Sequence, residues 1–172
     1  MNGTNFIREI IAFCLFIVAQ IAVFQYFTLF SIATPFVFPL FLLFLSPAVK
    51  APLVYGIAFL FGLLLDVLMN SYGIHSFCCV FLVAIRPFWI ILITPQINDN
   101  ELEQMKLKDQ SLAWQVSYLV PLLFFYTMTY SVLTEFSFQN ILRMLIRGLA
   151  CGFYSAVFCL IVTVLFYRKI SR

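Results

Sequence analysis

Charge is what this sequence has least of. Lys, Arg, Asp and Glu make up only 10% of the 172 residues, whereas a soluble domain of this size carries about 25%. Hydrophobic residues make up 64%, and the mean hydropathy is +1.06. A single core in water cannot hide that much apolar surface. The composition therefore excludes a soluble domain and indicates an integral membrane protein, folded as one domain over residues 1–172.

The motifs of catalysis and metal binding are also missing. The chain has one histidine, no C-x-x-C pair, no P-loop, no dinucleotide-binding fingerprint and no carboxylates paired for acid–base work. Its cysteines lie in apolar runs, so we interpret them as small hydrophobic residues. They are Cys14, Cys78, Cys79, Cys151 and Cys159. The sequence predicts a protein that is not an enzyme, holds no cofactor or metal, and binds no nucleic acid.

Long uncharged runs are what the sequence does contain. Residues 10–49 carry no charge, and as one helix they would measure about 60 Å, twice the hydrocarbon thickness of about 30 Å. The chain must therefore turn back, and we expect the turn near residues 31–35. The predicted fold is an all-α polytopic membrane protein with six transmembrane helices, at residues 10–30, 36–45, 51–69, 74–94, 112–133 and 141–167. A five-span alternative leaves residues 36–45 re-entrant.

The positions of Lys and Arg predict the orientation, because positively charged loops stay in the cytoplasm. Six spans with the N-terminus inside leave only Arg143 and Arg147 on the outer side. The other eight cations then lie on the inner side or in the inner half of a helix: Arg8, Lys50, Arg86, Lys106, Lys108, Arg168, Lys169 and Arg172. Both termini are expected in the cytoplasm, as is the polar loop at residues 95–110. That loop is either a solvated connector or a docking site for a partner.

Asp66 is the charged residue that stands out in the spanning segments. On a helix it shares one face with Gly62 and Asn70, and Gly62 would let a neighbouring helix approach closely. An ionisable side chain in a membrane helix usually faces the bundle interior, a partner or a water-filled path. We expect an ion pair with Arg143 or Arg147, supported by a hydrogen bond from Asn70. A direct contact with a partner or a solute is the alternative.

Three other features carry structural expectations. The Arg86–Pro87 pair predicts a kink, with the guanidinium either bonding the carbonyl groups that the proline frees or extending to the inner interface. Gly148 and Gly152 repeat at four-residue spacing, which predicts a close helix contact. His75 follows a turn, so we interpret it as a hydrogen-bonded residue at a helix start rather than a ligand.

The stretch "GLLLDVLMNSYGIHSF", followed by "AIRPF", resembles MreD, the family of rod shape-determining membrane proteins of bacteria. The matching positions are Gly62, Asp66 and Gly73, where Gly73 opens the next helix, together with Arg86 and Pro87. The specific part of the resemblance covers residues 62–88. Length and hydropathy extend it to the whole chain.

The resemblance implies a scaffold of the elongation complex in the bacterial inner membrane. Such a protein binds MreC and couples MreB filaments to peptidoglycan synthesis by RodA and its penicillin-binding transpeptidase, which maintains rod cell shape. The MreD family is also similar in fold to the substrate-binding subunits of energy-coupling-factor transporters, which implies a second function, the binding of a vitamin-type solute. A solute-binding subunit needs polar residues that converge from the outer loops. Those loops are short here, so the sequence favours the scaffold.

The orientation is testable with reporter fusions. Fusions after Glu103 and after Arg172 should both report a cytoplasmic location, because of the eight-to-two distribution of cations. An alkaline phosphatase signal at Arg172 would contradict the six-span topology.

Overall fold

In a computed structural model, the described part of the chain is all-helical. It comprises residues 15–18, 20, 22, 34–47, 49–96, 107, 110–135 and 141–170, with side chains to residue 164. Four of its helices are long and apolar enough to cross a membrane: α3 (Ala51–Met69), α4 (Ile74–Ile93), α6 (Leu112–Thr134) and α7 (Ile141–Ile170), the last through its part Ile141–Val164. The predictions of an all-helical fold and of membrane-spanning helices are confirmed at this level.

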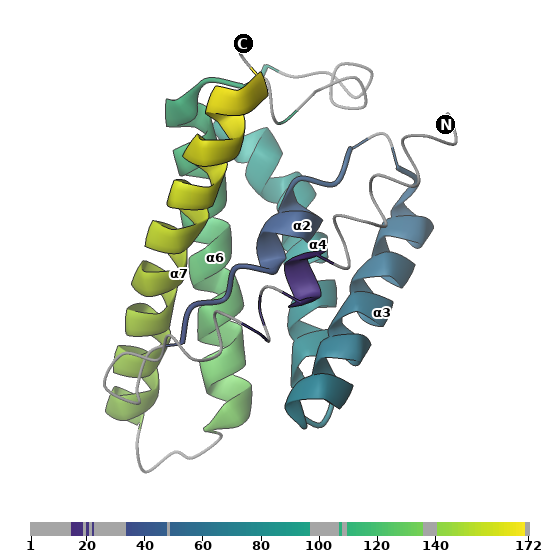
Figure 1. Ribbon diagram of the computed structural model, residues 1–172, viewed down its shortest axis with the longest axis vertical. Coiled ribbons are helices and arrows are strands. Elements are labelled where there is room, and N and C mark those ends of the chain that lie inside the picture. The colour runs from purple at the N-terminus through teal and green to yellow at the C-terminus, as the bar shows by residue number, and fades with distance from the viewer. Residues whose placement is uncertain are drawn as a thin grey trace.

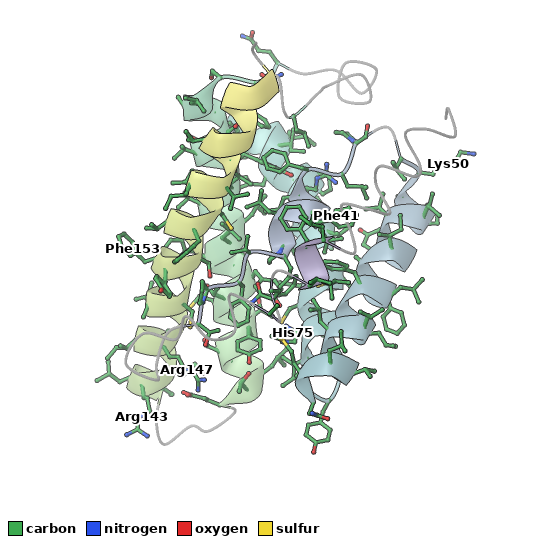
Figure 2. The ribbon with its side chains drawn as sticks, in the orientation of Figure 1. Phe41, Lys50, His75, Arg143, Arg147 and Phe153 are labelled. Atoms are coloured by element: carbon green, nitrogen blue, oxygen red, sulfur yellow. The ribbon has the colours of Figure 1, made fainter. Side chains whose placement is uncertain are left out.

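The four long helices run in alternating directions and pack side by side in the order α3, α4, α6, α7 (Figure 1). Lys50 lies at one end of the bundle, whereas Arg143 and Arg147 lie at the other (Figure 2). The distribution of cations in the sequence predicts this separation of Lys50 from the two arginines. Which end faces the cytoplasm stays a prediction.

Local chemistry sets the turn between α3 and α4. Asn70 ends α3 in the left-handed region at φ 54°, and Gly73 precedes α4 at φ 89°. Asparagine and glycine adopt this conformation at the lowest cost, because a bulkier side chain clashes with its own backbone there. The chain therefore reverses within four residues, and the predicted bounds of both helices hold to within one residue.

The second predicted span is wrong as a transmembrane helix. Residues 34–37 are not helical, and α2 contains only Pro39–Leu43, which is about 8 Å of helix against a hydrocarbon core of about 30 Å. Pro39 lacks the backbone N–H that an upstream helix would bond, so it favours the first turn of a helix, where it stands in α2. The first predicted span, at residues 10–30, falls largely outside the described residues. Of the polar loop at 95–110, only residues 95, 96, 107 and 110 are described.

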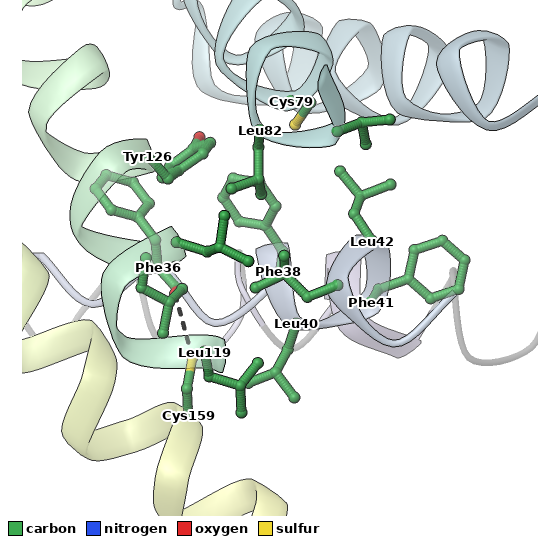
Figure 3. Packing of buried hydrophobic residues seen from close by; sticks show 14 of the residues in the cluster. Phe36, Phe38, Leu40, Phe41, Leu42, Cys79, Leu82, Leu119, Tyr126 and Cys159 are labelled. Carbon is green, nitrogen blue, oxygen red and sulfur yellow. Dashed lines mark hydrogen bonds between the residues drawn. The ribbon is translucent and has the colours of Figure 1, made fainter. Parts of the chain in front are cut away.

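Residues 36–45 form the centre of the bundle instead, and we call them the interior segment. Its large side chains apart from Phe44 are almost fully buried, with Phe38, Leu42 and Leu43 at 0% exposure. They pack against α4 and α6 beside Leu82, Leu119 and Tyr126 (Figure 3). The helices thus enclose a segment of their own chain.

Glycines set the distance between neighbouring helices. A Cβ atom at Gly62 would lie 2.4 Å from the Ser76 Cα atom, so α3 and α4 approach at backbone contact. At Gly148 and Gly152 it would lie 2.7 Å from side-chain atoms of Met128 and Phe124 on α6. All three glycines therefore occupy helix contacts, and the contact at Gly62 is the least adjustable because its neighbour is backbone.

Gly62→Ala should destabilise the fold by about 1–3 kcal/mol, because the added methyl group has no room. The matched control is Gly56→Ala on the same helix, where nothing lies within 4 Å of the added atom and alanine improves helix propensity by about 1 kcal/mol. Thermal unfolding in detergent should show a lower midpoint for the first variant only. Equal midpoints would refute the close contact.

Candidate functional site

The Asp66 carboxylate lies at the N-terminus of α4. Its Oδ1 accepts hydrogen bonds from the Ser71 hydroxyl at 2.7 Å and the His75 backbone N–H at 2.9 Å. Its Oδ2 accepts from the Ser76 backbone N–H at 2.8 Å and the Ser76 hydroxyl at 2.6 Å. Four donors therefore hold one carboxylate that is only 7% exposed.

This geometry is that of a helix cap supplied by a neighbouring helix. The first N–H groups of any helix lack intrahelical partners, and the N-terminus carries a partial positive charge that favours an anion. Gly73 occupies the N-cap position of α4 and has no side chain to offer. Asp66 provides the missing acceptor from α3, so it fixes the end of α4 against the end of α3.

The predicted ion pair of Asp66 is wrong. Arg147 instead pairs with Glu135 at 2.5 Å, and Arg143 is exposed on α7. The expected hydrogen bond from the side chain of Asn70 is also not among the four that hold the carboxylate: Asn70 is exposed and closes α3 through its backbone N–H, which donates to the Asp66 carbonyl. The N–H groups of α4 are closer in sequence and in space than either arginine.

Arg86 is buried in the opposite half of the bundle, at 5% exposure. Its Nε donates to the Tyr118 hydroxyl at 2.9 Å, its Nη2 donates to the Leu45 carbonyl, and Tyr118 in turn donates to the Leu43 carbonyl at 3.0 Å. The guanidinium therefore bonds one carbonyl of the interior segment directly and a second through Tyr118, rather than those that Pro87 frees, and it does not extend to the interface. The helix α4 continues through Pro87 to Ile93.

Three residues that sequence reasoning missed bind the other end of the interior segment. Gln20 accepts from the Val37 N–H at 2.9 Å and donates to the Pro35 carbonyl at 3.0 Å. Ser155 accepts from the Phe36 N–H at 2.8 Å, and the Cys159 thiol lies 3.6 Å from the Phe36 carbonyl oxygen (Figure 3). An amide inside an uncharged run was the available signal for Gln20. Nothing in the sequence marks Ser155 or Cys159.

His75 occupies the first turn of α4, as predicted for a helix-start residue. Its Nδ1 lies 2.7 Å from the Tyr126 hydroxyl, and its ring packs against Phe36, Phe38 and Tyr130. The imidazole is 1% exposed. It ties α4 to α6 and to the interior segment.

These polar groups serve internal hydrogen bonding. Asp66, Arg86, Tyr118 and His75 each bond to other parts of the same chain, and no cluster of three or more metal-ligating side chains occurs among the residues that the structure describes. No family model, curated protein or solved structure matches the chain. The site geometry is thus the chief guide to function.

Asp66→Ala should destabilise the protein by about 1–3 kcal/mol, because it leaves two buried N–H groups of α4 without an acceptor. Asp66→Asn keeps one acceptor oxygen and should lose less. Adding Arg147→Ala to Asp66→Ala should give additive losses of folded yield, since the two residues share no bond. A partial rescue by the arginine deletion would restore the ion pair as the explanation.

Proposed function

We propose that this protein is a membrane scaffold of the MreD type, which binds an MreC-like protein and holds the machinery of rod-shaped wall growth together in the bacterial inner membrane. The observation that carries the proposal is the interior segment. Its side chains fill the space between the helices, so the surfaces left for recognition are those that face outward.

The filled interior argues against the alternative of a solute-binding transporter subunit. A small-molecule site needs a cavity with a few convergent polar groups that are open to the ligand, and transporter sites use broken helices whose freed backbone groups face the substrate. The interior segment also has backbone groups without helical partners, yet these bond to Gln20, Ser155, Tyr118 and Arg86. The protein's own side chains take the places that a solute would occupy.

The outward faces of α3 and α7 are apolar and exposed, as a scaffold in a membrane requires. Leu60 and Val67 on α3 are 62% and 69% exposed, and Leu142 and Phe153 on α7 are 72% and 68% exposed. Such faces pack against lipid or against helices of other proteins, where close packing rather than hydrophobicity provides the attraction. The resemblance of residues 62–88 to MreD supplies the identity of the partners, an MreC-like protein, RodA with its transpeptidase, and MreB filaments.

Co-purification distinguishes the two functions. The tagged protein is expressed with the MreC-like protein of the same genome, purified in mild detergent with lipid, and examined for bound protein and for small solutes. A scaffold should retain the MreC-like protein, and depletion of the scaffold should make cells round. A tagged membrane protein of unrelated fold is the control for carry-over. A stoichiometric vitamin-type solute without the MreC-like protein would establish the transporter subunit instead.

A further inference from the structure

A groove of about 660 Å³ runs along the outward side of the α3–α4 pair. Its walls are apolar and come from both helices. They include Phe59, Leu63 and Val67 of α3 with Phe77 and Val80 of α4. The interior segment does not contribute to it, so the groove lies outside the bundle core and meets the hydrogen-bonded site described above only at Asp66 and Ser76.

The length of the groove matches one leaflet of a bilayer. It begins at the turn between the two helices, at one end of the bundle, and its lining on α3 extends from Asn70 back to Phe59. Eleven helical steps correspond to about 16 Å, which is half of the hydrocarbon core of about 30 Å. A transmembrane helix of a partner needs a contact surface across the whole core, whereas an acyl chain of one leaflet needs only this half.

The polarity of the groove also changes in the direction that a lipid requires. Its polar members, Asp66, Asn70, Tyr72 and Ser76, all lie toward the turn, and Tyr72 is 98% exposed there. The deeper part is lined by the apolar walls alone. A molecule with a polar head and one hydrocarbon chain is complementary to this arrangement.

The charge of the groove favours one class of head group. Among the described residues that line the groove, Asp66 is the single charged one, and residues 51–85 contain no Lys or Arg. A lipid with a net negative head group finds no cation on these walls, whereas an ammonium group is attracted to the carboxylate. We infer that the groove binds one acyl chain of an amine-headed, zwitterionic phospholipid, with its head group beside Asn70 and Tyr72.

The test uses the full protein in nanodiscs with equal amounts of phosphatidylethanolamine and phosphatidylglycerol, followed by detergent extraction and native mass spectrometry. Leu63→Trp places an indole in the groove, and Leu64→Trp is the matched control outside its lining. Both leucines are similarly exposed, at 42% and 40%. The wild type and the control should retain one phosphatidylethanolamine. In Leu63→Trp the indole should displace about two methylene groups of the acyl chain from the groove. Retention of phosphatidylethanolamine by this variant should therefore be about tenfold lower.

Val67→Trp, at a wall residue that is 69% exposed, repeats the test if Leu63→Trp fails to fold. Equal lipid retention by groove and control variants would overturn the inference, as would retention of phosphatidylglycerol in preference. Loss of the MreC-like protein from Leu63→Trp with lipid retention unchanged would assign the groove to a partner helix and overturn it as well. The lipid result does not depend on the proposed scaffold function, since lipid retention is measured without any partner.

Discussion

A backbone polar group inside the hydrocarbon must find its partner within the protein, because no water is available there. Several of the buried polar residues of this bundle follow from that constraint. The interior segment begins in a stretch, residues 34–37, that is not helical, and it contains only one short helix, so several of its N–H and C=O groups have no helical partner. Gln20 and Ser155 bind them at one end, and Arg86 and Tyr118 bind them at the other.

The same constraint explains the carboxylate of Asp66. An isolated charge in a low-dielectric interior is very costly, but a carboxylate that accepts several hydrogen bonds at a helix N-terminus is compensated without a cation. The first N–H groups of a spanning helix need such an acceptor wherever the helix starts below the membrane surface. Ser71 and Ser76 complete the arrangement, so side-chain hydrogen bonds join the end of α3 to the start of α4 across the turn.

A bundle whose interior is filled and internally bonded presents recognition surfaces only on its outside. The aromatic cluster of Phe36, Phe38, His75 and Tyr126 packs the interior segment against α4 and α6, and dense packing of this kind resists deformation. A densely packed bundle with apolar outer faces is compatible with the proposed role of holding other membrane proteins in place. It is poorly suited to opening and closing around a solute.

The sequence by itself determined the four long helices, because about twenty uncharged residues between turn signals have few other stable structures in a membrane. It also predicted the close approach at Gly62, since only the absence of a side chain permits it. Tertiary structure alone decided the partners of Arg86 and the course of residues 36–45. A short apolar run has the same composition whether it spans lipid or fills a bundle, and hydrogen bonds such as Phe36 to Ser155 join residues 119 positions apart. Which donors and acceptors meet across that separation depends on how the helices pack, and no local pattern encodes it.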